Sequence, residues 1–410
     1  MITAHQYKLR PNQEQASQFD DWLSLLRMQY NWRRAERFNW FESTRSPVNS
    51  CSVVSCSIAP IVKQPDSYWQ KKDLLNTKKL FPEYSGIHSQ VLLNCIERVK
   101  KAFDRYIKAD SSGKRSGKLR FKGRGRYNTF TYTQMKQDCI KGNCITLPKI
   151  GDVKIILHRP IRDGFKIQTA TIVFAADGYY VTLTLQDESV PVISLDFNRQ
   201  KLVGIDMGLN EFLNTSEADT VPIPQFARKS GQVKKRLNKS VFRKNKGSNR
   251  RGKAVKRLSR HDQKVARQGK DFHYKTAKQL LDKYDLIGFE DLKIKGRAKT
   301  RFAKSILDAG WSEFLAIVAC KVQSAGKMAI AVNPNGTTQN CSSWGTRIPK
   351  TMANRWHSCH LCGSELDRDV NAAINVNNFA LERTVIKASL SVSYVDAGLA
   401  QKSTLYSSTS

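Results

Sequence analysis

Three acidic residues stand in sequence settings that suit a metal-dependent nuclease. Asp206 ends the run Val-Gly-Ile-Asp, Glu290 ends Leu-Ile-Gly-Phe-Glu, and Asp369 begins Asp-Val-Asn-Ala-Ala. A cluster of carboxylates is costly without cations. Two divalent ions roughly 3.5 to 4 Å apart would stabilise it and clamp the attacking and leaving oxygens of a phosphodiester. The trio therefore predicts phosphodiester cleavage, with two Mg²⁺ ions held by Asp206, Glu290 and Asp369.

Two of these carboxylates are expected at the ends of buried strands. The short apolar runs Leu202–Ile205 and Leu286–Phe289 precede Asp206 and Glu290, and such runs form strands inside a parallel sheet. After Asp369, apolar residues recur at helical spacing, so a helix can turn this side chain toward the strand ends. The arrangement predicts the α/β fold of an RNase H-like nuclease.

Each motif alone also has an ordinary structural explanation. Asp-x-Gly is a common strand-to-turn signal, and Glu-Asp often begins a helix. Asp291 is expected on the opposite face of a continuing strand, and Asp367 is expected to cap the helix. The three candidates occur in one order from residue 206 to residue 369, each beside an apolar element. This joint pattern favours the catalytic interpretation.

The chain carries a large positive charge. Its 410 residues include 69 Lys and Arg against 35 Asp and Glu, a net charge of +34. Such a surface repels itself unless a polyanion compensates, so nucleic acid is the expected partner. No apolar run predicts a membrane span, and the first residues do not resemble a signal peptide. Nine cysteines, an odd number in a long chain, favour a reducing cytoplasm.

Two basic segments are candidate nucleic-acid interfaces. Residues 100–126 are rich in Lys, Arg and Gly and run into aromatic residues, a mixture that neutralises phosphates and stacks bases; a solvated loop explains it equally well. The segment Arg228–Lys270 holds 18 Lys and Arg and one acid, Asp262, and its apolar residues predict helices. The candidate contact residues are Arg120, Lys122, Arg124, Lys234, Lys235, Arg236, Arg250, Arg251, Lys256 and Arg257.

The rest of the chain is expected to form more than one domain. Helical patterns follow Pro11 and span His88–Ile107, whereas residues 48–90 show no clear period. Later elements are predicted as strands at 144–147, 153–157, 167–174 and 179–185, forming an antiparallel sheet or barrel, then a helix at 311–322 and a strand at 328–332. Residues from about Ala388 are Ser-rich and are expected to be mobile.

Cysteines upstream of Asp369 suggest a zinc knuckle that lacks one ligand. Cys341 stands alone, whereas Cys359 and Cys362 form Cys-x-x-Cys followed by Gly. Trp344 occupies the position expected for the second cysteine of the first half.

Structural zinc takes four ligands, so another group would have to join the three cysteines. His357 is the predicted fourth ligand, and His360 is geometrically poorer because it lies inside the Cys-x-x-Cys turn. The alternatives are weak binding, or a knuckle without metal that is held by packing of Trp344 and Trp356.

The combined motifs resemble those of the TnpB family, RNA-guided nucleases of bacterial insertion sequences related to type V CRISPR effectors. The matching stretches are Tyr7–Pro11, Leu119–Arg124, Leu147–Gly151, Gly204–Gly208, Phe289–Leu292, Arg355–Cys359 and Asp367–Ala373, of which the last is the most specific. Trp344 and the tail from about Ile386 depart from the family pattern.

The resemblance implies a RuvC-like nuclease with a zinc-knuckle-like insert, preceded by a β-barrel wedge region and a helical recognition region. The implied boundaries are 1–12 and 118–195 for the wedge, 13–117 for recognition, 200–336 for the first part of the nuclease with its basic helical segment 228–283, 337–364 for the insert, 365–382 for the last part of the nuclease and 383–410 for a disordered tail. The implied triad is Asp206, Glu290 and Asp369, the residues already reached from strand ends and charge.

The implied function is an RNA-guided DNA endonuclease of a transposable element that cuts beside a short flanking motif. Base pairing with the guide RNA would read the target DNA. Two other functions stay open. An RNA-independent transposase or resolvase would use the same kind of core, and a non-cleaving RNA-guided DNA-binding protein is disfavoured by the complete triad.

Overall fold

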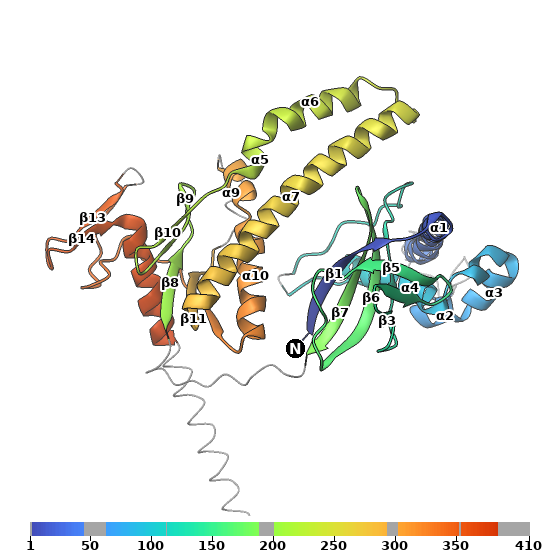
Figure 1. Cartoon of the computed structure of the whole chain (residues 1–410), viewed down its shortest axis with the longest axis horizontal. Coiled ribbons are helices and arrows are strands. Elements are labelled where there is room, and N and C mark those ends of the chain that lie inside the picture. Colours follow the sequence, from blue (N-terminus) through green and yellow to red (C-terminus); the bar gives the residue numbers. More distant parts are fainter. Residues whose placement is uncertain are drawn as a thin grey trace, which may run out of the picture. The chain divides into compact units, whose positions relative to one another are not determined.

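The structure of the chain, a computed structural model, describes residues 2–44, 63–111, 113–187, 201–292, 302–351 and 354–383. It forms two compact units, Met1–Ser189 and Val190–Ser410 (Figure 1). Within the described ranges, no helix is both long and apolar enough to cross a membrane. The tail expected after residue 383 lies outside the described residues.

A seven-stranded antiparallel sheet forms the framework of the first unit. Its strands are β1 (Ile2–Arg10), β2 (Thr129–Tyr132), β3 (Ile140–Lys141), β4 (Cys144–Leu147), β5 (Gly151–Ile156), β6 (Phe165–Ala175) and β7 (Gly178–Asp187), in the order β2-β6-β7-β1-β5-β4-β3. The four strands predicted between residues 144 and 185 are confirmed. The outermost strands β2 and β3 do not pair with each other, so of the two predicted alternatives, sheet or barrel, the described residues form an open sheet.

Helices cover the apolar face of this sheet. α1 (Gln13–Ser43) begins with a capping box at Asn12, and its Phe19 and Trp22 contact the Phe130 ring of β2. α4 (Ser89–Ile107) packs beside α1, and both predicted helices are confirmed. The short helices α2 (Ser67–Lys72), α3 (Leu74–Leu80) and η1 (Pro82–Gly86) were not predicted, since elements this short hold too few residues to show a helical period.

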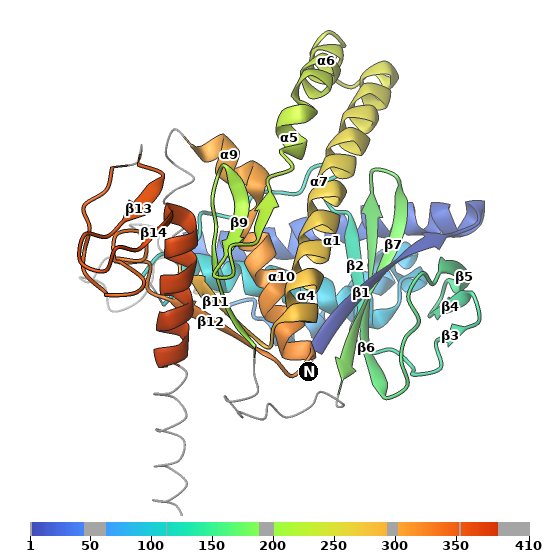
Figure 2. The ribbon, with the colours of Figure 1, turned by 60° about the vertical axis from the view of Figure 1, so that its left-hand side comes forward.

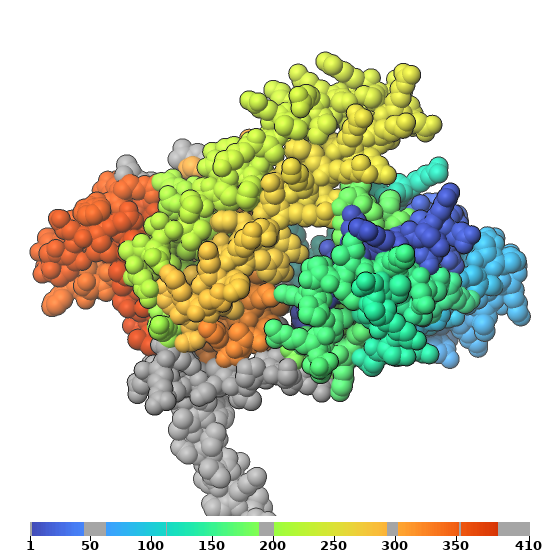
Figure 3. All heavy atoms as spheres, viewed as in Figure 1, coloured from blue at the N-terminus to red at the C-terminus, as the bar shows by residue number. Residues whose placement is uncertain are grey.

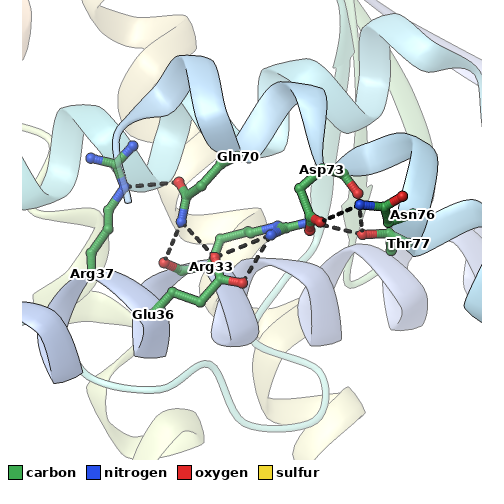
Figure 4. Close-up of polar contacts among 7 residues, drawn as sticks. All are labelled: Arg33, Glu36, Arg37, Gln70, Asp73, Asn76 and Thr77. Atoms are coloured by element: carbon green, nitrogen blue, oxygen red, sulfur yellow. Dashed lines mark hydrogen bonds and ion pairs between the residues drawn. The ribbon is translucent and has the colours of Figure 1, made fainter. Parts of the chain in front are cut away.

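A buried polar network holds α2 and α3 on α1 (Figure 4). The guanidinium of Arg33 is fully buried; it donates to Glu36 at 2.9 Å and pairs with Asp73 at 2.7 Å. Gln70 of α2 donates to the Arg33 carbonyl at 3.0 Å and accepts from Arg37 Nε at 2.9 Å. These ion pairs and hydrogen bonds offset much of the cost of burying charge, although Arg33 Nε and Arg37 Nη2 have no partner among the described residues.

A five-stranded mixed sheet organises the second unit. Strands β8 (Leu202–Asp206), β9 (Glu211–Thr215), β10 (Thr220–Pro222), β11 (Leu286–Glu290) and β12 (Met328–Val332) lie in the order β10-β9-β8-β11-β12. β11 pairs in parallel with β8 and β12, whereas β9 is antiparallel to β8 and β10. The predicted strands that end at the two carboxylates are confirmed.

Helices cover both faces of this sheet (Figure 2). On one face, α7 (Asn249–Lys283) and α10 (Trp311–Ser324) share a core with Val203, Ile205 and Ile287 of the strands. On the other face, a helix over 368–383 packs Val376 and Ala380 against β11 and β12. α9 (Ala303–Ala309) precedes α10. Residues of β8 and β11 therefore alternate between two helical layers.

The basic segment forms a helical hairpin, here called the arm. α5 (Phe226–Lys229) leads into α6 (Gly231–Phe242), which packs along the outer half of α7. The arm extends away from the sheet of its unit (Figure 1). Its helical character was predicted and is confirmed. The buried residues near the base of α7 are His273, Thr276, Ala277 and Leu280.

Candidate functional site

Asp206 and Glu290 end neighbouring parallel strands. The register pairs Ile205 with Phe289, so the two carboxylates follow at the same edge of the sheet. Because side chains alternate along a strand, Asp206 shares a face with Gly204, and Glu290 shares that face with Gly288. This is the face that the helix over 368–383 covers.

The two glycines let this helix lie directly on the strands. A Cβ at Gly204 would lie 2.1 Å from the carbonyl oxygen of Ala373 and 2.5 Å from the backbone nitrogen of Asn377. A Cβ at Gly288 would lie 2.8 Å from Ala380 Cβ. In both motifs a glycine therefore stands two residues before the acid. At this position the helix over 368–383 comes closest to the strand.

Asp369 lies in the first turn of this helix. Asp367 Oδ1 accepts hydrogen bonds from the backbone N–H groups of Asp369 at 2.8 Å and Val370 at 3.3 Å, which confirms the predicted cap. Asp291, expected to point away from the site, is exposed.

The structure brings the three predicted carboxylates into electrostatic contact. Burial, followed by the negative charges of Glu290 and Asp369, raises the pKa of Asp206 to about 8. Glu290 is buried and accepts a hydrogen bond from the Thr337 hydroxyl. The three carboxylates therefore oppose one another's ionisation, although their oxygens do not converge as closely as the thiols of Cys341, Cys359 and Cys362 do. A divalent cation bound among them would remove that opposition.

Two arginines that the sequence interpretation missed hold Asp369. Arg355 Nη1 lies 3.2 Å from Asp369 Oδ2, and Arg368 Nη2 lies 3.0 Å from Oδ1. Arg355 also reaches the side-chain amide of Asn210 in the loop after β8. Arg355 comes from the knuckle segment, 14 residues before Asp369, and its only sequence signal was its place in a family motif.

The three predicted zinc-ligand cysteines lie together. The Sγ atoms of Cys341, Cys359 and Cys362 are all within 4.8 Å of one another. Two matching turns present them: the N–H of Gly345 donates to the Cys341 carbonyl at 2.8 Å, and that of Gly363 donates to the Cys359 carbonyl at 2.8 Å. Both glycines have positive φ, 77° and 67°. Three adjacent thiols fit a soft cation such as Zn²⁺.

The described structure shows neither the predicted fourth ligand, His357, within the cysteine cluster nor the alternative packing of Trp344 and Trp356. His357, in β13 (Trp356–Ser358), is fully buried but does not join the cysteine cluster; its Nδ1 contacts Lys350 Nζ instead. The strand carries it two residues away from Cys359, where Lys350 reaches it. Trp344 takes the position that matches Cys362, but it is 67% exposed and Trp356 is 58% exposed, so neither tryptophan packs as a substitute for metal.

The candidate contacts at 120–124 lie in a loop docked on α1. Arg34 donates to the Leu119 carbonyl at 3.0 Å, and Asn31 exchanges two hydrogen bonds with the backbone of Lys122. Arg120 and Arg124 remain exposed. The hydrogen bonds to α1 fix the backbone of this loop, while the guanidinium groups of Arg120 and Arg124 stay accessible to a ligand.

The candidate contacts on the arm are mostly exposed. Lys234 pairs with Asp262 at 3.1 Å. Arg251 is half-buried, and its guanidinium donates to the Lys244 carbonyl at 3.3 Å, which gives it a structural role in the turn of the arm. The exposed members are Lys234, Lys235, Arg236, Arg250, Lys256 and Arg257.

Three family models match the chain. Residues 188–301 match the family described as "Probable transposase", 311–376 match the "Cas12f1-like, TNB domain", and 1–46 match a "Helix-turn-helix domain". The first range contains Asp206 and Glu290, and the second contains the cysteine cluster and Asp369. In the structure, the third range is β1 followed by the single long helix α1.

A protein of Streptomyces pristinaespiralis with the name "Putative RNA-guided DNA endonuclease" is 25% identical over 379 residues, covering 91% of this chain and 88% of its own. The TnpB-like protein L79 of Acanthamoeba polyphaga mimivirus is 27% identical over 227 residues, covering 49% and 44%. The chain is thus similar to members of the TnpB family. A solved complex of Cas12f1 with sgRNA and target DNA aligns with a TM-score of 0.54 and 14% identity over 89% of this chain and 83% of Cas12f1. The two therefore share a mixed α/β fold.

Proposed function

We propose that this chain is a member of the TnpB family and an RNA-guided DNA endonuclease of a transposable element. The observation that carries the proposal is the convergence of Asp206, Glu290 and Asp369 from two strands and a helix at one edge of the sheet. The relative from S. pristinaespiralis supports it, because that protein is named for this activity and matches nearly the whole chain. The strand order and parallel β8–β11–β12 core suit a RuvC-like, RNase H-type nuclease.

The two units suggest a division of labour. The first unit would supply the wedge (1–12 and 118–195) and recognition region (13–117) that hold guide RNA and target DNA. The second would supply the nuclease, with 337–364 as a zinc-binding insert between its parts. The net charge of +34 provides the attraction for both polyanions.

In this proposal the three carboxylates hold two Mg²⁺ ions. When bound, the ions would activate the attacking water and stabilise the departing oxygen. The chain prepares the site around them. The Thr337 hydroxyl orients Glu290, and the Asp367 cap fixes the helix turn that presents Asp369. The raised pKa of Asp206 means that its carboxyl must release a proton before it can serve as a ligand.

Arg355 would act at the entrance of this site. Its side chain is 49% exposed while its guanidinium touches Asp369. A guanidinium can instead bind a phosphate in bidentate fashion. We propose that Arg355 exchanges Asp369 for a phosphate of the DNA strand as metal ions take over the carboxylate.

The experiment that tests the function starts from Asp206→Asn, expressed beside its native flanking DNA. RNA that copurifies with this protein is sequenced, and wild-type protein is then tested on DNA that matches the RNA. Discrete RNA ending in sequence beyond the element, and Mg²⁺-dependent cutting by wild type only, are expected. Asp291→Asn is the matched control, because this neighbouring carboxylate is exposed and should be dispensable. Random cellular RNA together with cutting at transposon ends would instead identify an RNA-independent transposase.

A further inference from the structure

The turn of the arm presents an aromatic side chain to solvent. Phe242, the last residue of α6, is 80% exposed, the highest value among the large hydrophobic side chains of the described residues. Figure 3 shows the arm, in yellow-green and yellow, standing out from the body of its unit. A single exposed apolar side chain is common on protein surfaces, so its meaning depends on the residues that surround it.

The arm does not need Phe242 for its own packing. The preceding residue, Val241, is 7% exposed, and Ala254 of α7 is 6% exposed, so these two side chains fill the contact between the helices near the turn. Successive residues of a helix lie about 100° apart. Packing of Val241 therefore turns Phe242 away from α7.

The turn that presents this ring is well built. Ser248 caps α7 by accepting from the Arg251 N–H at 3.1 Å, and the Arg251 guanidinium donates back to the Lys244 carbonyl at 3.3 Å. Gly247 supplies the positive φ of 85° that the turn requires. The ring is thus held on a defined scaffold, which lowers the entropy that a contact would cost.

The charged residues that flank Phe242 in the sequence are all basic. No acidic residue occurs from residue 220 to residue 261. Arg243, Lys246, Arg250 and Lys253, which follow Phe242 along the chain through the turn and into α7, are all exposed. An aromatic ring between cations matches a nucleotide, which offers a π-face and a phosphate within one unit, and it matches neither an acyl chain nor an ordinary apolar protein pocket.

We propose that the turn of the arm binds RNA by stacking Phe242 on an unpaired base, while Arg243, Lys246 and Arg250 neutralise the adjoining phosphates. Only the choice of RNA over DNA rests on the proposed function. With a rise of 1.5 Å per residue, α7 places its start about 36 Å from His273 at the base. A resident guide RNA can present a loop at that distance, whereas the DNA strand being cut must lie at Asp206.

Binding is measured with full-length, nuclease-treated protein and short RNA probes. One probe is a hairpin with an unpaired loop, and the other is a fully paired duplex of equal charge. Phe242→Ala should weaken binding of the looped probe about ten-fold, within the range for loss of one stacked base, and leave the duplex unchanged. Phe242→Trp should retain binding. Phe242→Leu, which is apolar but cannot stack, should behave like Phe242→Ala.

The salt dependence separates stacking from charge. Phe242→Ala should leave the slope of log K against log salt unchanged, whereas Arg250→Ala should reduce its magnitude by about 1. Equal melting temperatures for all Phe242 variants would show that the fold is intact.

The proposal is overturned if Phe242→Ala binds the looped RNA like wild type, if duplex binding falls equally, or if Phe242→Leu binds normally. A larger loss on single-stranded DNA than on looped RNA would overturn the choice of RNA. These results do not depend on cleavage. A wild-type protein that never cuts guided DNA but loses loop binding on Phe242→Ala would refute the proposed function and leave this inference standing.

Discussion

Gly204→Ala tests whether the glycines before the carboxylates are what bring Asp369 to the strand ends. The added Cβ would lie 2.1 Å from the Ala373 carbonyl oxygen and 2.5 Å from the Asn377 nitrogen. Carbon and oxygen atoms approach to about 3.3 Å at closest. The helix over 368–383 must therefore retreat by about 1.2 Å, and it carries Asp369 with it.

The expected losses follow from this displacement. A misplacement of about 1 Å near reacting groups lowers a rate about 100-fold, and overpacking costs about 1 to 3 kcal/mol. Single-turnover cleavage by Gly204→Ala should therefore fall about 100-fold, and its melting temperature should drop by about 2 to 12 °C. The assays are cleavage of guide-matched DNA at saturating Mg²⁺ and a thermal melt of the same preparation.

Matched variants make the result specific. Gly269→Ala adds the same methyl group to α7, where no atom lies within 4 Å, so it should cut normally and gain up to about 1 kcal/mol of stability. Gly288→Ala meets Ala380 Cβ at 2.8 Å, so adding Ala380→Gly should restore part of its activity. Truncating a side chain should not rescue Gly204→Ala, because the two nearest neighbours of the added Cβ are backbone atoms. Wild-type cutting by Gly204→Ala, or an equal loss in Gly269→Ala, would refute the reasoning.

Three further predictions concern the metal sites. The pKa of the Asp206 carboxyl is raised from 3.8 to about 8 in the folded chain. Between pH 3.8 and about pH 8 the metal-free folded chain therefore keeps a proton on Asp206 that the unfolded chain has released. The free energy of unfolding should fall as pH rises through this window. Asp206→Asn should flatten the dependence in melts from pH 5 to 8, and equal slopes for both proteins would contradict the assignment. Arg355→Ala should bind Mg²⁺ more tightly, because a competing cation leaves Asp369, yet cut about ten-fold more slowly at saturating Mg²⁺; unchanged metal affinity and rate would exclude the proposed exchange. The purified chain should contain about one Zn²⁺, and Trp344→Cys should slow its loss to a chelator, since the matching turn already places this residue opposite Cys362; His357→Ala, by contrast, should not speed zinc loss.

Local patterns were enough to predict much of this chain. Burial of one face of a helix, or of one short strand, produces a regular pattern of apolar residues in the sequence. Such patterns predicted the strands before Asp206 and Glu290, the helix after Asp369 and the helices of the arm. The Asp367 cap followed from the same logic, because capping depends on neighbours within four residues. The cysteine spacing also predicted that Cys341 would meet Cys359 and Cys362.

Other features required the folded chain. Arg355 reaches Asp369 only because the knuckle returns beside the helix, and His357 finds Lys350 in place of the cysteines. The role of Gly204 is visible only against Ala373, far away in the sequence. Polar and close-packed contacts of this kind depend on pairs of distant residues, and a single distant pair produces no periodic signal in either segment. Periodicity records which residues are buried, whereas the partner that each one meets is set by how the elements pack.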